Sequence, residues 1–315
     1  MYSGTHKTAL WLQFVYIFSL LGTIMIKIWM MTAGQMMESL QLLPQSWVSM
    51  PIGVYRLLLI VMLIINSVYL HYMLLYHNLI ELRDYRTVIF YGLMHIAMPC
   101  SLALSNMIVE SIFLYFILPR ILVSNTEGKN DNEFMYGFFC GFLSLIYPPL
   151  ILLLFPLYFI YLVNRDLTFK RAVIPLMGWG LLVVYQWAYA YLTDASMSYA
   201  AWNWRWEGEI LHTRLVEVIC IAACIIIMSI ITIQMYAKAG KVVVNRRKKW
   251  YVLMISYVLL MLLMILFKDE HHLYLSIWSM VAVTLLSVGI FHFKTKVWNY
   301  VLILLYILAL YVNFV

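Results

Sequence analysis

Long apolar runs follow one another along this chain with only short polar breaks between them. A helix needs about 20 apolar residues to cross the roughly 30 Å hydrocarbon layer of a bilayer. Of the 315 residues, 65% are hydrophobic and only 11% are charged, whereas a soluble domain carries about 25% charged residues. The core of a soluble protein could not bury so many hydrophobic residues. We therefore expect an all-α integral membrane protein that has lipid as its main solvent.

Nine of these runs are long enough to be membrane helices, and we place them near residues 9–30, 53–78, 87–103, 105–123, 172–192, 215–236, 250–267, 273–291 and 297–314. A further apolar stretch, residues 134–163, is interrupted by Pro148 and Pro149. Proline kinks or ends a helix because it has no backbone N–H and its ring crowds the preceding turn. This stretch is either one kinked helix or a hairpin of two short helices.

The positions of the basic residues favour the hairpin. With the N-terminus inside and the hairpin counted as two segments, sixteen of the 21 Lys and Arg residues fall in cytoplasmic loops. A single crossing would move the loop around Arg165 and the NRRKK sequence to the outer side, against the positive-inside rule. The sequence therefore predicts one domain over residues 1–315 with about eleven membrane segments, a cytoplasmic N-terminus and an outward C-terminus.

Composition and missing motifs exclude several functions. The net charge of +7 is explained by the cytoplasmic loops, so we expect membrane lipids and not nucleic acid as partners. The sequence has no phosphate-binding glycine loop, dinucleotide fingerprint, nucleophile elbow or calcium loop, and we expect no cofactor. Four cysteines in apolar segments are expected to pack as small hydrophobic residues without a disulfide: Cys100, Cys140, Cys220 and Cys224.

The richest candidate site is the stretch WNWRWEGE, in the predicted outer loop between residues 193 and 214. It alternates polar residues with three tryptophans: Trp202, Trp204 and Trp206. Alternate residues of an extended loop share one face, so these indole rings could stack together on a sugar. Arg205 is a candidate for phosphate binding, and Glu207 and Glu209 are candidates for a catalytic base. The alternative is an aromatic belt, since Trp prefers the headgroup level of a membrane.

Charged residues also occur inside the predicted spans. Glu110 lies one to two turns inside the helix at 105–123, and Glu217 is placed similarly in its own helix. An ionised group at such depth costs about 2.5–3.5 kcal/mol, so it usually pairs or faces a cavity. The predicted topology puts both acids on the outer side. One interpretation is that these acids form salt bridges with nearby basic residues or that the charged side chains extend toward the headgroups. The alternative is an outward cavity that binds an anionic head group through basic residues, for which the candidates are Lys27, Arg56, Arg205 and Arg214.

A second polar cluster lies in the sequence FKDEHHLY. It contains Asp269, Glu270, His271 and His272, which are metal ligands by type. Adjacent histidines point in different directions, and the i, i+4 spacing typical of zinc sites is missing. We therefore interpret this cluster as a solvated loop and keep it as a weak metal candidate. The isolated histidines His71, His77, His95 and His292 are expected to be packed or interfacial.

Residues 102–163 contain LALSNMIVESIFLYFILPRIL, a polar turn and GFFCGFLSLIYPPLILLLFPLYFIYLV. This order of helix, glycine-rich half-helix and proline turn resembles the middle region of GT-C-fold membrane glycosyltransferases. From Arg56 to about Asp194, the chain is more closely similar to an uncharacterised family of multi-pass inner-membrane proteins common in Bacteroidota. That similarity rests on the helix with Gly137 and Gly141, the LSLIYPP turn and a basic loop before GWGLLVVYQWAYAYL.

The GT-C resemblance implies a GT-C-like helix order, a lipid-phosphate-linked sugar donor and an acidic base or metal ligand in the first outer loop. In this sequence the only acid of that loop is Glu38, and the aspartate usual in the family is absent. We therefore expect a bacterial inner-membrane protein of envelope biogenesis that handles a polyprenyl-phosphate-linked sugar or a similar lipid. Glu38, Glu207 and Glu209 are the candidate catalytic residues. The alternatives are a scaffold subunit with an envelope protein partner, and a lipid transporter or flippase.

Overall fold

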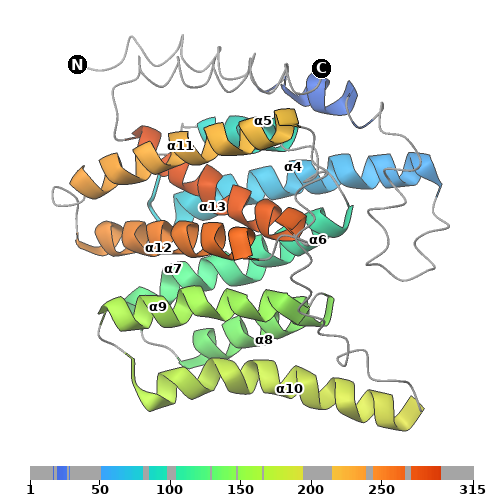
Figure 1. The fold of residues 1–315 in the computed structure, drawn as a ribbon, viewed down its shortest axis with the longest axis vertical. Helices are drawn as coiled ribbons and strands as arrows, with labels where there is room; N and C mark the ends of the chain where they lie inside the picture. Colours follow the sequence, from blue (N-terminus) through green and yellow to red (C-terminus); the bar gives the residue numbers. More distant parts are fainter. Residues whose placement is uncertain are drawn as a thin grey trace.

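The computed structural model describes residues 17, 20–26, 28, 51–80, 85–97, 104–127, 130–146, 148–164, 167–193, 215–238, 244–266 and 271–291. Within these residues every regular element is a helix (Figure 1). Their bounds are α4 (Ile52–Tyr76), α5 (Arg86–Ala97), α6 (Leu104–Ile112), the π-helical turn η2 (Phe113–Ile117), α7 (Leu118–Glu127), α8 (Asn130–Ile146), the 3-10 turn η3 (Pro148–Leu153), α9 (Leu154–Asn164), α10 (Phe169–Thr193), α11 (Leu215–Lys238), α12 (Val244–Leu266) and α13 (His271–Phe291).

Three of the described helices are long and apolar enough to cross a membrane, namely Ile52–Tyr76, Leu104–Val123 and Phe169–Thr193. Two shorter apolar helices cover Leu150–Leu162 and Tyr274–Gly289. The predicted all-α class is thereby confirmed, and these helices are those of a membrane protein. The count of eleven segments, the orientation in the membrane and the GT-C-like helix order stay predictions.

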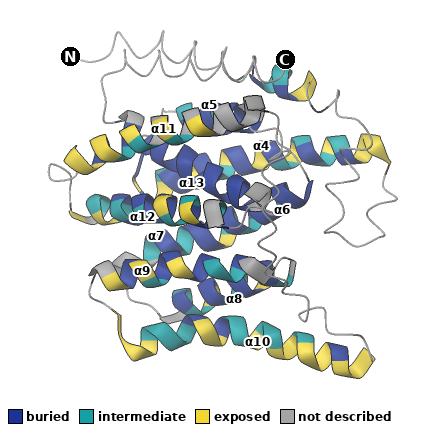
Figure 2. Ribbon diagram, viewed as in Figure 1, coloured by how far each residue is buried: buried dark blue, intermediate teal, exposed yellow. Residues whose placement is uncertain are grey.

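Helix α13 forms the centre of the bundle. It contacts α12, α5, α6 and α11, and its residues from Tyr274 to Gly289 are all buried (Figure 2). A helix that is apolar on every side has no solvent-facing stripe and is stable only when other helices surround it. Three hydroxyls within this stretch, those of Ser279, Thr284 and Ser287, donate to carbonyls about one turn earlier, as Thr284 does to Met280 at 2.8 Å. These bonds give the three buried hydroxyls partners within the helix itself.

Helices α8 and α9 form an antiparallel pair. Glu133, near the start of α8, interacts electrostatically with the hydroxyl of Tyr161, near the end of α9. The two helices are joined by the 3-10 turn that begins at Pro148, where the sequence predicts a hairpin. Proline restricts the residue before it to extended conformations, so a pair of prolines ends α8 and allows the chain to reverse.

Helix α10 packs at the edge of the bundle, mainly against α8. The two backbones approach closely at glycines: a Cβ on Gly137 would overlap the carbonyl of Pro175, and one on Gly178 would overlap the carbonyl of Phe134. Small residues permit such contact between membrane helices. The ion pair of Arg171 with the buried carboxylate of Glu133, at 3.5 Å, ties the two helices together at one end.

The C-terminal end of α4 is fixed by two basic residues of α12. The chain leaves α4 through Asn78, which has a φ of 55°, in the left-handed region that asparagine tolerates. Arg246 Nε donates to the Asn78 carbonyl at 2.7 Å, and Lys249 Nζ donates to the His77 carbonyl at 3.2 Å. A positive charge is unfavourable in the first turn of a helix, where Arg246 lies in α12. The charges of Arg246 and Lys249 instead compensate the carbonyl groups at the C-terminal end of α4.

This junction makes the stability of the protein pH-dependent through His77. Burial, followed by the positive charge of Lys249, lowers the pKa of His77 from 6.5 to about 4. Between pH about 6.5 and about 4 the unfolded chain therefore binds a proton that the folded protein does not bind. Stability is expected to fall as the pH is lowered through this window. His77→Asn should make that slope shallower in thermal unfolding scans of the purified protein, and equal slopes for both proteins would contradict this assignment.

Candidate functional site: a buried carboxylate–imidazole pair

Glu110 lies in the middle of the bundle, where α6 passes α4, α5 and α13. Its side chain is 0% exposed, although a carboxylate is among the groups least often buried completely. Moving an unpaired carboxylate out of water costs several kcal/mol. The fold therefore has to supply hydrogen bonds and a proton or a positive charge at this position.

The partners of Glu110 come from one face of α5. The Tyr91 hydroxyl donates to Glu110 Oε1 at 2.6 Å, and His95 Nε2 lies 3.1 Å from Glu110 Oε2. His95 is 0% exposed, like Glu110. Residues four apart lie on the same side of a helix, which is why Tyr91 and His95 reach the same carboxyl group. Their rings also pack against each other, with centroids 4.2 Å apart.

The hydrogen bonds fix the number of protons in this pair. His95 Nδ1 lies 2.9 Å from the Tyr91 carbonyl, which can only accept, so Nδ1 carries a hydrogen. Nε2 and Oε2 then need one proton between them. Either a protonated Glu110 donates to a neutral His95, or an imidazolium donates to a carboxylate. Both arrangements are neutral overall, and a second proton or the loss of the first would leave a net charge in an apolar interior.

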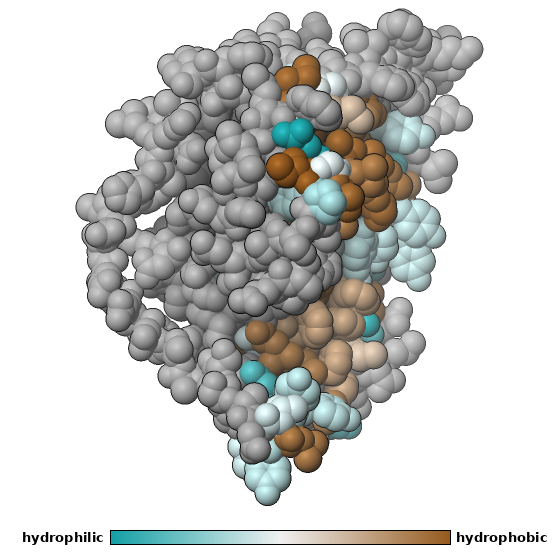
Figure 3. Space-filling view, turned by 90° about the vertical axis from the view of Figure 1, so that its right-hand side faces the viewer, coloured by the Kyte–Doolittle hydropathy of each residue, from teal (hydrophilic) through white to brown (hydrophobic). Residues whose placement is uncertain are grey.

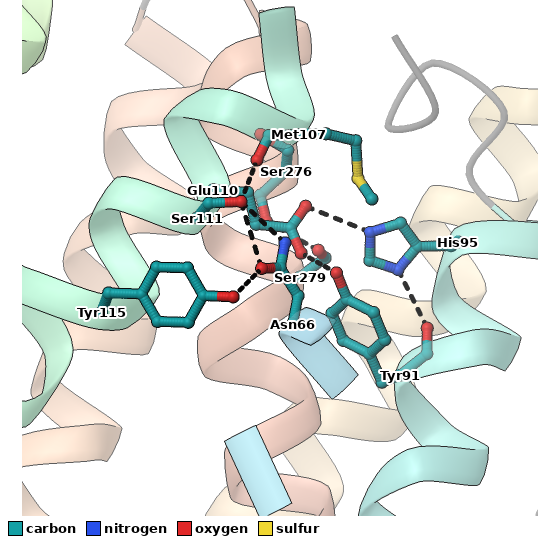
Figure 4. Close-up of polar contacts among 9 residues, drawn as sticks. All are labelled: Asn66, Tyr91, His95, Met107, Glu110, Ser111, Tyr115, Ser276 and Ser279. Carbon is teal, nitrogen blue, oxygen red and sulfur yellow. Dashed lines mark hydrogen bonds and ion pairs between the residues drawn. The ribbon is translucent and has the colours of Figure 1, made fainter. Parts of the chain in front are cut away.

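A second group of polar residues adjoins Glu110, as Figure 4 shows. Asn66 Nδ2 donates to Ser111 Oγ at 2.9 Å, and Ser111 donates to the Met107 carbonyl at 2.6 Å. The Tyr115 hydroxyl donates to Asn66 Oδ1 at 2.7 Å. The Asn66 amide also hydrogen-bonds the Tyr91 hydroxyl. The two groups therefore form one network that joins α4, α5 and α6.

The helix that carries Glu110 changes its geometry just beyond the site. Residues Phe113–Ile117 form a π-helical turn between α6 and α7. Pro119, two residues later, has no N–H to offer the preceding turn, and its ring needs extra room there. The wider turn brings Tyr115 into line with Asn66. Single π turns within α-helices occur frequently at functional sites, which supports this region as the candidate site.

Helix α13 completes the surroundings of the network. Ser276 and Ser279 project from it toward Asn66 and Glu110 in Figure 4. Ser279 donates to the Ser276 carbonyl at 2.6 Å, and both side chains are buried. The site is thus built by three consecutive helices, α4, α5 and α6, and by α13, which lies far from them in the sequence.

Of the residues proposed from the sequence, the structure describes the side chains of Glu110 and Arg56. Arg56 is half-buried near the start of α4, ten residues before Asn66, or about 15 Å along the helix axis. Glu110 is paired with His95 and Tyr91 instead of a lysine or arginine. Ten of the remaining candidates lie outside the described residues: Glu38, Trp202, Trp204, Arg205, Trp206, Glu207, Glu209, Arg214, Asp269 and Glu270. His271 and His272 begin α13, and the structure describes their backbone but not their side chains.

Among the described residues, no group of three or more His, Cys, Asp or Glu side chains is placed to hold a metal ion. The described cysteine side chain, Cys140, is a buried free thiol in α8.

Five residues of the network were not proposed from the sequence as site residues: Asn66, Tyr91, His95, Ser111 and Tyr115. A recognisable sequence pattern was present for the first three. Asn66 interrupts the apolar run of α4, and His95 follows Tyr91 by four positions on a helix with few other polar groups. Since a buried polar group needs a partner, each of them required one, but sequence spacing cannot show which helices meet.

Comparison with known proteins finds no matching family model, no similar curated protein and no similar solved structure. The function is therefore argued from the residues of the site.

Proposed function

We propose that this chain is a bacterial inner-membrane, multi-pass protein that moves or binds an amphiphilic envelope lipid, with the Glu110–His95 pair as its proton-binding centre. The observation that supports the proposal is the contact between Glu110 Oε2 and His95 Nε2, at 3.1 Å with both side chains 0% exposed. Acids and histidines within membrane helices frequently form the proton relays of transporters.

The pair is suited to holding and releasing one proton. One proton shared between Glu110 Oε2 and His95 Nε2, which lie 3.1 Å apart, can move from one atom to the other without changing the net charge of the pair. In the closed bundle the neutral pair resists both gain and loss of charge. Proton exchange therefore requires a conformation that admits water to Glu110. The adjacent π turn supplies a place at which α6 can shift relative to α7.

The lipid substrate is proposed on sequence grounds. The tryptophan-rich stretch and Glu38 are suited to a phosphate-linked sugar, and the GT-C resemblance implies the same class of ligand. Arg56 and Arg205 are the candidates for phosphate binding in this scheme. The alternative is a non-enzymatic scaffold subunit of an envelope complex, which would be recovered together with a stoichiometric protein partner.

Glu110→Gln is the variant that tests the proton-binding role. Its amide oxygen can accept from Tyr91, and its amide nitrogen can donate to a neutral His95, so both contacts are kept and the exchangeable proton is removed. We expect the purified variant to fold. In vesicles with an imposed pH gradient, wild-type protein should accelerate the movement of a fluorescent polyprenyl-phosphate lipid about tenfold or more, and Glu110→Gln should reduce this to the protein-free rate.

Glu133→Gln is the matched control, because Glu133 is also a buried glutamate (1% exposed) but lies on α8, outside the network. It should keep at least about half of the wild-type rate. If Glu110→Gln moves the lipid as fast as the wild type under the same gradient, the proposal is wrong.

A further inference from the structure

Arg120 lies at the end of the second described span. The apolar helix runs from Leu104 to Val123, so Arg120 is three residues, or about 4.5 Å, from its end. Its side chain is half-buried. Long basic side chains at this depth place their charged groups at the level of the lipid headgroups.

The protein satisfies only part of the Arg120 guanidinium. Nη1 donates to the Phe116 carbonyl at 2.6 Å. Nε is buried and has no hydrogen-bond partner among the described residues. A guanidinium has five N–H donors, and burying its charge is costly unless an anion compensates. Arg171 differs in this respect, because it pairs with Glu133 at 3.5 Å.

The surroundings of Arg120 are aromatic. Its guanidinium carbon lies 5.0 Å above the centre of the Phe139 ring, a cation–π contact. Phe116, whose ring stacks on Phe139 at 4.1 Å, is 38% exposed. The contact with Phe139 and the bond to the Phe116 carbonyl hold the guanidinium in one orientation. Nε is buried, so the donors open to a ligand are those at the tip of the guanidinium. A fixed positive tip beside the exposed ring of Phe116 matches a ligand that combines a phosphate with a hydrocarbon chain.

The exposed helices on this protein offer mainly apolar side chains to their surroundings. On the face drawn in Figure 3, the described residues form hydrophobic areas that are bordered by hydrophilic residues. Lipid is the medium that such surfaces require. A phosphate near Arg120 therefore belongs to a lipid that already lies against the helices, rather than to a soluble anion.

Arg120 is also linked to the buried pair. Its Nη1 donates to the carbonyl of Phe116, whose ring packs edge-on against the ring of Tyr115, with centroids 6.4 Å apart. Tyr115 donates to Asn66, the amide that contacts the network around Glu110. A ligand at Arg120 would thus act at one end of a continuous set of contacts that reaches the proton-binding centre.

We propose that Arg120 binds the phosphate group of an anionic membrane lipid, with Phe116 and Phe139 contacting the lipid beside it. The link from this lipid to Glu110 rests on the proposed function, whereas lipid binding at Arg120 is measured separately.

The test uses the full chain in detergent, with lipids added one at a time. Native mass spectrometry would follow the retention of phosphatidylglycerol, phosphatidic acid, phosphatidylcholine and inorganic phosphate. We expect the wild type to retain one phosphatidylglycerol or phosphatidic acid molecule in preference to phosphatidylcholine. Arg120→Gln should weaken that retention about tenfold or more, because it removes charge-assisted hydrogen bonds. Arg247→Gln removes the same charge from another half-buried arginine and should leave retention unchanged.

Arg120→Lys provides a second variant in case Arg120→Gln does not fold. It keeps the charge and loses the guanidinium tip, so retention should fall several-fold. Three results would overturn the proposal: equal retention by wild type and Arg120→Gln, equal retention of phosphatidylcholine and phosphatidylglycerol, or displacement of the lipid by an equal concentration of inorganic phosphate. Selective lipid binding at Arg120 combined with unchanged lipid movement in Glu110→Gln would reject the proposed function alone.

Discussion

Gly178→Ala is expected to push α10 away from α8 and to destabilise the protein by about 3 kcal/mol, at the upper end of the cost of overpacking. The added Cβ would overlap the Phe134 carbonyl and would lie 2.7 Å from the Phe138 backbone nitrogen. Both atoms belong to the α8 backbone, so no side-chain rotation can relieve the clash. Thermal unfolding of the purified protein in detergent measures the loss.

Gly180 provides the matched control on the same helix. A Cβ at Gly180 meets nothing within 4 Å. Gly180→Ala should therefore be neutral or slightly stabilising, because alanine is favoured over glycine in a helix by about 1 kcal/mol. If both alanine variants unfold at the same temperature, the close contact of α8 and α10 does not stabilise this protein.

The second large effect is expected at Glu110. Glu110→Ala leaves the buried His95 imidazole and the Tyr91 hydroxyl without their acceptor, and removal of one partner from a buried pair costs about 3–5 kcal/mol. Glu110→Gln keeps both hydrogen bonds and should cost much less. The comparison of these two variants by equilibrium unfolding separates the loss of hydrogen bonds from the loss of the proton.

A double-mutant cycle checks that His95 is the partner concerned. His95→Phe fills the same space without a polar atom to satisfy. In combination with Glu110→Ala it should cost at least 1 kcal/mol less than the sum of the single changes, as contacting residues couple by about 0.5–3 kcal/mol. Strictly additive costs would mean that the two side chains do not stabilise each other.

The helices could be predicted from the sequence because an apolar run, or a proline that ends it, is recognised from neighbouring residues alone. The expected run at 53–78 corresponds to α4, and the run at 172–192 lies within α10. The break at Pro148 and Pro149 was visible for the same reason, since proline affects its own turn directly. The π turn at Phe113–Ile117 was missed. Pro119, two residues beyond it, disturbs this turn locally, but the residues of the turn are as apolar as their neighbours and do not by themselves indicate a π-helix.

The candidate site could be predicted only in part. Glu110 was recognisable because a carboxylate in an apolar helix always needs an explanation. The sequence suggested pairing with a base at the same end of the bundle, such as Arg56. Helix packing instead brought α5 against α6, which gave Glu110 a histidine and a tyrosine as partners. The same holds for the glycines. Gly137 and Gly141 were noticed in the sequence, but only the structure shows that the backbone at Pro175 packs against Gly137.

The central position of α13 has a consequence for biosynthesis. Glu110 and Tyr274 are 164 positions apart in the sequence. At about 5–20 residues per second, roughly 10–30 s pass between the synthesis of the acid and that of the helix that encloses it. During this interval α4, α5 and α6 lack their central helix. The hydrogen bonds of Glu110 to His95 and Tyr91 join α5 and α6 without any residue of α13, so they can form before α13 is made and keep the acid compensated until then.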